Sequence, residues 1–180
     1  MSGTADPVAV RSLSSEEASI RIAELADILV DAVAHGSSVN FLAGFDEAGA
    51  IAFWRGQLPG VADGSRFLFV AEGQGAIVGT TVLTLAPQPN APHRAEIGKM
   101  LVHSTARRRR LGTRLLSAAE ETARRLGRTL LLLDTHTGSA GEHLYRSCGW
   151  TEFGVVPGHA LTPDGQPAPT TFFYKRLASP

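Results

Sequence analysis

A run of consecutive arginines, Arg107–Arg110, gives this sequence its most distinctive local chemistry. It lies in the stretch HSTARRRRLGTRLL, between a strand-like segment and a helix-like one. A strand that leads into a helix leaves the first N–H groups of the helix, and the positive end of its dipole, free to bind an anion. Cations added at that end need a partner of opposite charge, and Gly112 lets a ligand approach the backbone closely. The stretch therefore predicts a site for a polyanion such as a pyrophosphate.

Nucleic-acid binding and a merely solvated helix start are the two alternatives for this run. Lysine plus arginine (17) equals aspartate plus glutamate (17), so the chain has no broad positive field. Residues 100–130 contain no Phe, Tyr or Trp that could stack on bases. A solvated start is disfavoured because positive charge opposes the dipole at that end of a helix. We expect no nucleic-acid partner.

Length and composition indicate one globular domain over residues 1–180. The chain is 43% hydrophobic and 19% charged, as in ordinary soluble domains. Its one cysteine, Cys148, excludes an internal disulfide and any zinc site built on paired cysteines, and it suits a reducing cytoplasm. The start lacks a signal-peptide pattern, and no apolar run approaches the roughly 18 residues of a membrane span. We expect a cytoplasmic protein without a membrane partner.

Hydrophobic periodicity predicts the elements that must position the loop. Helices are expected from Ser14 or Ser15 to Ala34, and over Asp46–Leu58, Arg110–Leu126 and Ser139–Cys148, with Pro59-Gly60 ending the second. Strands are expected over Val8–Leu13, Phe67–Glu72, Ile77–Leu85, Ala95–His103, Thr129–Thr135, Trp150–Val156 and Thr170–Leu177. This order predicts an α/β (α+β) protein whose mixed sheet has helices on both faces.

The stretch MLVHSTARRRRLGTRLL resembles the coenzyme A motif of the GNAT superfamily of N-acetyltransferases, V-x-P-x-x-[QR]-x-x-G-x-[GA]. Val102, Arg107 and Gly112 occupy its valine, its glutamine-or-arginine and its last small position. Ser104 replaces the usual proline and Arg110 replaces the first glycine. A side chain at position 110 is expected to crowd the pyrophosphate or to alter the dihedral angles of the loop.

Further segments carry the same resemblance. EHLYRSCGW fits the later pattern A-x-x-L-Y-x-x-x-G-F, with Tyr145, Gly149 and Trp150 in register. AHGSSVNFLAG, AEIGKMLV, LDTHTGSA and PGHALTPDGQPAPTTFFYKRL together resemble the tabtoxin-resistance type of acetyltransferase. The resemblance implies the GNAT fold: a mixed, mostly antiparallel, twisted sheet of about seven strands with a parallel splayed pair and helices on both faces.

The resemblance also implies the reaction, which is acetyl-CoA-dependent transfer to the amine of a small molecule, such as an antibiotic or toxin. It makes Tyr145 the acid, and Glu96 and Asp134 the candidate bases. It further implies that the cofactor is bound by the end of the strand before the arginine run, by the loop that contains this run and by the start of the helix after it, together with Tyr145. The residues are Met100, Leu101, Val102, Arg107, Arg108, Arg109, Arg110, Leu111, Gly112, Thr113 and Tyr145.

Acceptor contacts are expected in the connection between the first two helices. The candidates there are His35, Ser38, Asn40 and Phe41. A protein or peptide acceptor and a non-catalytic coenzyme-A-binding regulator stay open as alternatives, as does the oligomeric state, a homodimer included. The histidines lack the H-x-x-x-H spacing of a metal site, so no metal is expected.

Overall fold

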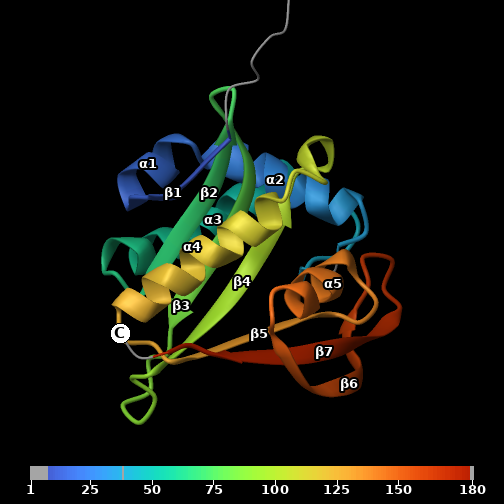
Figure 1. Ribbon diagram of the computed structural model, residues 1–180. Coiled ribbons are helices and arrows are strands. Elements are labelled where there is room, and N and C mark those ends of the chain that lie inside the picture. The colour runs from blue at the N-terminus through green and yellow to red at the C-terminus, as the bar shows by residue number, and fades with distance from the viewer. Residues whose placement is uncertain (1–7, 38, 179–180) are drawn as a thin grey trace, which may run out of the picture.

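The computed structural model describes residues 8–37 and 39–178, and its centre is a sheet of seven strands in the order β1-β2-β3-β4-β5-β7-β6 (Figure 1). Only the β4–β5 pair is parallel, and every other neighbouring pair is antiparallel. The strands are β1 (Ala9–Leu13), β2 (Arg66–Gly73), β3 (Ala76–Leu85), β4 (Arg94–Val102), β5 (Leu130–His136), β6 (Thr151–Leu161) and β7 (Pro167–Arg176). The fold predicted from the sequence is confirmed.

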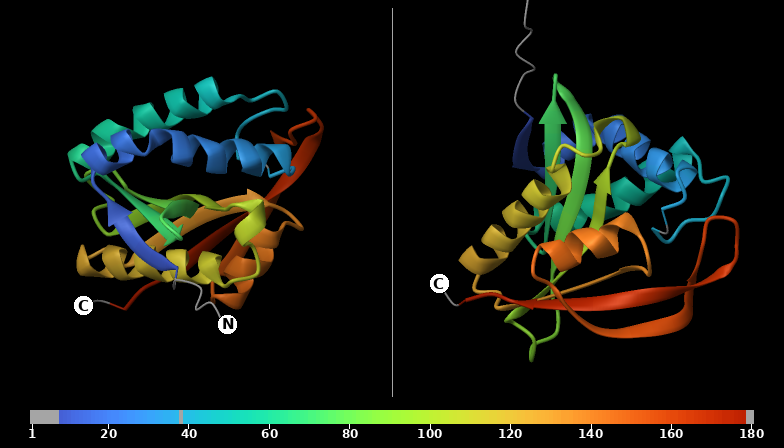
Figure 2. Two further views of the ribbon diagram at one scale, coloured as in Figure 1. Left: turned by 90° about the horizontal axis from the view of Figure 1, so that it is seen from above. Right: turned by 45° about the vertical axis from the view of Figure 1, so that its right-hand side comes forward.

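Helices cover both faces of the sheet, as the view from above in Figure 2 shows. One face carries α1 (Ser15–Ile20), α2 (Ile22–Ala34) and α3 (Glu47–Ala62), and the other carries α4 (Leu111–Arg125) and α5 (Ala140–Ser147). Each layer has its own apolar core, with Trp54 fully buried in the first and Leu115 in the second. Within the described ranges, no helix is both long and apolar enough to cross a membrane.

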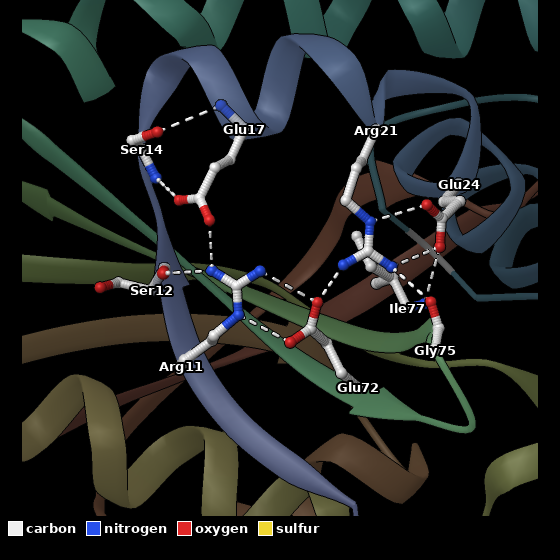
Figure 3. Close-up of polar contacts among 9 residues, drawn as sticks. All are labelled: Arg11, Ser12, Ser14, Glu17, Arg21, Glu24, Glu72, Gly75 and Ile77. Carbon is white, nitrogen blue, oxygen red and sulfur yellow. Dashed lines mark hydrogen bonds and ion pairs between the residues drawn. The ribbon is translucent and has the colours of Figure 1, made fainter.

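The first helical segment is interrupted at Arg21, so the prediction of one helix reaching Ala34 is wrong. Ser14 caps α1 as expected, and its hydroxyl accepts the Glu17 N–H at 3.1 Å. Arg21 then leaves helical geometry, and its guanidinium pairs with Glu24 at 2.6 Å and also with Glu72 of β2 (Figure 3). The local pair with Glu24 accompanies the break, and the long-range pair with Glu72 attaches the start of α2 to the sheet.

The second predicted helix, by contrast, runs on through Pro59 to Ala62. Its start is as expected, because the Asp46 carboxylate caps it by accepting the Gly49 N–H at 2.8 Å. Its end was predicted at Pro59-Gly60, but Val61 still packs against the apolar core of that face. Tertiary packing therefore overrides the helix-breaking tendency of proline at this position.

The final hairpin is also longer than predicted. β6 extends to Leu161 although Pro157 and Gly158 lie within it, which an edge strand tolerates because one side of its backbone needs no partner strand. The hairpin tip reaches the connection between α2 and α3, where the Ala43 N–H donates to the Pro163 carbonyl at 2.7 Å. Two segments that are far apart in sequence thus meet beside the open end of the β4–β5 pair (Figure 2).

Candidate active site

The sheet opens between its two parallel strands. Pairing of β4 with β5 covers only three residue pairs and ends at Glu96 opposite Leu132. Beyond that point β4 stays paired with β3 as far as Val102, and β5 stays paired with β7 as far as His136, so the two strands diverge (Figure 1). The edge of β4 over Met100, Leu101 and Val102 therefore has no strand partner on the β5 side among the described residues. Its backbone groups are available to a ligand.

A bulge in β4 lies next to the start of this opening. Two residues, Lys99 and Met100, face the single residue Thr81 of β3, and Lys99 takes a φ of +49°. The buried side chains of β3 fix this geometry: the Thr80 hydroxyl donates to the Lys99 carbonyl at 3.0 Å, and the Thr81 hydroxyl donates to the Gly98 carbonyl at 3.3 Å. A bulge bends its strand, and this one lies just beyond the point at which β4 and β5 stop pairing.

The arginine run forms the turn between β4 and α4, after a short 3-10 segment over Ser104–Ala106. Arg108 and Arg110 are left-handed, with φ of +65° and +57°, and Arg110 precedes α4 without capping it. Left-handed residues interleaved with others turn successive N–H groups toward one point, a geometry that binds anions. All the arginines of the run are exposed, and none forms an ion pair in the parts of the chain that are described. The residues present fit a diphosphate.

The two departures from the coenzyme A motif have visible structural consequences. Arg110 adopts the left-handed conformation that a glycine would reach without strain, so the loop retains that backbone geometry despite the side chain. Ser104 binds the buried end of Asp31 on α2: its N–H donates at 2.8 Å and its hydroxyl at 2.7 Å. The serine therefore attaches the phosphate loop to α2, which a proline could not do.

Gly112 has a packing role in addition to the one expected from the sequence. A Cβ at this position would lie 2.8 Å from Cδ2 of Leu144, so the glycine lets α4 approach α5. Tyr145 follows Leu144 on α5, and this close contact therefore helps to place the expected acid. The close approach of a ligand to the Gly112 backbone stays a prediction.

The structure brings Glu96, Asp134 and Tyr145 into one electrostatic group at the opening. Burial of the Glu96 carboxyl end raises its pKa, although much of the residue is exposed, and the negative charge of Asp134 raises it further. The same two causes, burial first and then Asp134, raise the pKa of Tyr145. Asp134, an exposed residue of β5, thus acts on both of the other residues.

Tyr145 is almost wholly buried, but its hydroxyl is not used by the residues that the structure describes. The residue is only 6% exposed, and its ring lies between Trp150 and Phe173, with centroids 6.1 and 6.0 Å away. The hydroxyl makes no hydrogen bond within the described part of the chain. Its oxygen is not completely shielded from solvent. Its oxygen is therefore accessible, and it can donate to a ligand.

The candidate acceptor contacts divide into different environments. His35 is exposed and engaged with Asp31, its Nδ1 lying 3.2 Å from Oδ1, beside the phosphate loop. Asn40 is exposed, with a φ of +71°, and Ser38 lies outside the described residues. Phe41 stacks on Phe45 at a centroid distance of 3.9 Å and faces the β4 bulge. Of these candidates, Phe41 is the one that lies close to the β4 bulge, where its ring is near Lys99.

Sequence reasoning missed Lys99 as a site residue. Its ammonium lies 5.9 Å from the centre of the Phe41 ring and 5.2 Å from that of Phe53 on α3. Burial lowers the pKa of Lys99, and the charge of Asp134 offsets part of that effect. One signal was present: Lys99 and Lys175 are the only lysines in a chain that uses arginine everywhere else.

A hollow of about 480 Å³ lies beside this region, between the end of α2, the α2–α3 connection and the tip of the β6–β7 hairpin. Phe45 lines it, whereas Glu96, Asp134 and Tyr145 do not. The hollow is therefore separate from these three residues, and the Phe41–Phe45 stack connects it to the region of the β4 bulge.

Comparison with known proteins agrees with this geometry. The sequence matches the family described as the acetyltransferase (GNAT) family over residues 23–150, and the chain therefore belongs to this family. Acetyl-CoA is the acetyl donor of the family, as the sequence predicts.

Solved structures share the fold. They include yncA from Salmonella typhimurium with its cofactor acetyl-CoA (19% identity, TM-score 0.76, covering 97% of this chain and 98% of that one). A phosphinothricin acetyltransferase from Sinorhizobium meliloti in complex with acetyl-CoA has 18% identity, a TM-score of 0.76 and coverages of 95% and 89%. The ribosomal-protein-alanine N-acetyltransferase from Brucella melitensis has 25% identity, a TM-score of 0.72 and coverages of 94% and 99%.

Proposed function

We propose that this chain is a cytoplasmic N-acetyltransferase that transfers the acetyl group of acetyl-CoA directly to the amine of a small molecule. The observation that carries the proposal is the group formed by Glu96, Asp134 and Tyr145 at the β4–β5 opening, next to an anion-binding loop. When bound, acetyl-CoA supplies a thioester carbonyl, which an amine can attack. The residues of the chain then have three tasks: binding the cofactor, accepting the proton that the amine loses and stabilising the departing thiolate.

The phosphate loop and the free edge of β4 perform the binding. Arg107–Arg110 and the first N–H groups of α4 would hold the diphosphate. The unpaired edge of β4 over Met100–Val102 offers N–H donors for the pantetheine arm and for the carbonyl oxygen as negative charge develops on it. Backbone donors fixed in a sheet need no rearrangement during the reaction.

Glu96 is the group that we assign as the base. An ordinary glutamate, with a pKa near ~4.3, is a weak base for an ammonium group. The raised pKa of Glu96 strengthens it, and the exposed Asp134 attracts the ammonium form of the acceptor. Glu96 then removes the proton that the nitrogen loses, directly or through one water molecule.

Tyr145 donates a hydrogen bond to the departing sulfur. Its raised pKa keeps the phenol protonated, but it also makes the phenol a weaker acid than a thiol, whose pKa is about 8.5. We therefore assign Tyr145 to stabilising the thiolate, while the proton that completes the thiol comes ultimately from the amine. The balanced products are an N-acetylated amine and the free thiol of coenzyme A.

A small acceptor is favoured over a protein because one contact restricts access to the acceptor side. The hairpin tip is hydrogen-bonded to the α2–α3 connection through Ala43 and Pro163, which closes one route by which a peptide could cross the site. The segments that resemble the tabtoxin-resistance type add a toxin or antibiotic amine as the acceptor that we propose to test first.

The direct test is release of the coenzyme A thiol from acetyl-CoA in the presence of a panel of amines, with mass spectrometry of the products. We expect acetylated product with at least one small amine and a large loss of rate in Glu96→Gln. Glu121→Gln, which removes a carboxylate from the exposed face of α4, is the matched control and should keep the full rate. Tight binding of acetyl-CoA without turnover of any amine or peptide would instead favour a regulator.

A further inference from the structure

The two lysines of the chain have opposite environments. Lys175 is fully paired: its ammonium lies 2.7 Å from Oε2 of Glu120, and it also donates to the Cys148 carbonyl at 2.8 Å. Lys99 has no carboxylate within ion-pair distance in the described ranges, and its only hydrogen bond there is a long one of 3.4 Å to the Val39 carbonyl. A cation removed from water without a counter-ion is costly, so a feature of this kind needs an explanation.

Aromatic rings hold the Lys99 side chain in place but do not neutralise it. Phe41 and Phe53 lie within 6 Å of the ammonium, and cation–π attraction of this kind is worth only about 0.5–2 kcal/mol. The rings order the stem of the lysine while its charge stays available. The rings come from the α2–α3 connection and from α3, so the ammonium lies on the acceptor side of β4.

The backbone at Lys99 is strained in order to produce this placement. A non-glycine residue with positive φ is unfavourable, and two buried threonines of β3 hold the bulge that imposes it. A regular strand would not need this arrangement. The bulge redirects a side chain close to the opening, which is a recognised use of bulges next to active sites.

Charges of both signs therefore occur on the same side of the opening. Asp134 acts electrostatically on Lys99 as well as on Glu96, so the cation and the two carboxylates share one region. A zwitterion fits this pattern, because its ammonium group would face the carboxylates and its anionic group would face Lys99. A simple amine would leave the ammonium of Lys99 without a partner.

We infer that Lys99 binds a carboxylate of the acceptor, and that the acceptor is an amino acid or another amine that carries a carboxylate. This inference rests on the proposed function, whose reaction it leaves unchanged. Lys99 acts as a binding residue that selects the acceptor, while Glu96 removes the proton.

The test compares acceptors that differ only in charge: the common L-amino acids against their primary amides, each with acetyl-CoA. Three variants accompany the parent. Lys99→Met keeps an unbranched stem between the two phenylalanine rings but removes the charge, and Lys99→Arg restores a cation. Arg55→Met removes a charge from the exposed surface of α3 and serves as the control.

We expect one or more amino acids to react faster than their amides. In Lys99→Met the KM for that amino acid should rise about 10- to 100-fold, as for loss of a hydrogen bond between charged groups, while the amide reacts nearly as before. Lys99→Arg should recover part of the loss, and Arg55→Met should match the parent. Preference for the amides, or an equal loss of kcat on both members of a pair, would overturn the inference.

A second measurement tests carboxylate binding by Lys99 without relying on turnover. It applies even if no acceptor in the panel reacts, a result that would count against the proposed function. With only two lysines, a chain labelled with ¹³C and ¹⁵N in lysine gives two side-chain signals, and Lys175 is the internal reference. A mixture of N-acetyl amino acids should shift the Lys99 signal in the presence of coenzyme A, and the matching N-acetyl amides should not. The absence of a shift with every carboxylate tested would overturn the inference independently of turnover.

Discussion

Ser104→Pro is the most informative single change, because it restores the residue that the coenzyme A motif usually has at this position. The backbone already accommodates proline, since the preceding His103 has φ −52° and ψ 140°, the extended geometry that a residue before proline prefers. The substitution nevertheless removes both donors to Asp31, the N–H at 2.8 Å and the hydroxyl at 2.7 Å.

The size of the effect follows from the state of Asp31. Each hydrogen bond to a charged group contributes about 1.5–3 kcal/mol. The Asp31 side chain is 10% exposed, and in the variant it keeps His35 at 3.2 Å and His103 at 3.6 Å. Water and these histidines can replace part of the lost hydrogen bonding, so the loss of stability should be near the lower limit of about 1.5 kcal/mol for each bond. We expect a loss of about 3 kcal/mol, which lowers the Tm by about 6–12 °C in a chain of this size.

Calorimetry of Ser104→Pro, Asp31→Ala and the double variant tests this reasoning as a cycle. If the serine acts through Asp31, Ser104→Pro should destabilise the Asp31→Ala protein much less than it destabilises the parent. An equal loss of stability in both backgrounds, or a Ser104→Pro protein as stable as the parent, would refute it.

The pH dependence provides a further check. Burial acts to raise the pKa of Asp31, but hydrogen bonds from Ser104 and the neighbouring histidines outweigh it, so the pKa is lowered on folding. A lowered carboxyl pKa adds stability above the unfolded value of about 3.9, and that stability is lost as the pH falls through the folded value. The stability difference between the parent and Ser104→Pro should therefore shrink in acid.

Three further changes separate chemistry from packing. Glu96→Gln should abolish the rise of activity with pH that a base with a raised pKa produces. It should also raise the Tm at neutral pH, with the gain disappearing below about pH 4, because a carboxyl whose pKa rises on folding loses stability when ionised. Tyr145→Phe should lower kcat by about 10²-fold with little change in Tm, since its hydroxyl has no partner among the described residues; an unchanged kcat would remove it from the mechanism. Gly112→Val should cost about 1–3 kcal/mol through its contact with Leu144 as well as weakening acetyl-CoA binding, and Leu144→Ala should restore part of the stability if that contact is the cause.

Local patterns in the sequence were sufficient for most elements. The start of α1 at Ser14 or Ser15, the start of α3 at Asp46 and the course of α4 all depend on neighbours within a few residues, and the structure confirms each of them. The break at Arg21 and the continuation through Pro59 depend on Glu72 and on the apolar core of that face, which lie far away in sequence. Propensity alone could not predict them.

The site divides in the same way. The arginine loop could be placed between a strand and a helix because its motif is contiguous in sequence, and its binding of phosphate stays a prediction. The opening itself depends on where the β4–β5 pairing stops, and that is decided by the register of three strands together. Glu96 and Asp134 could be named as candidates, but their shared location with Lys99 could not be derived without this register.

The bulge in β4 links the two parts of the proposed mechanism. The Thr80 and Thr81 hydroxyls bind the carbonyls of Lys99 and Gly98, and they hold the bulge in the part of β4 whose edge toward β5 has no partner strand among the described residues. The same irregularity directs Lys99 toward Phe41 and Phe53. Binding of the thioester carbonyl and selection of the acceptor would therefore both depend on buried side chains of β3 that touch neither ligand. A change at Thr80 should accordingly weaken both functions together, although neither substrate contacts that residue.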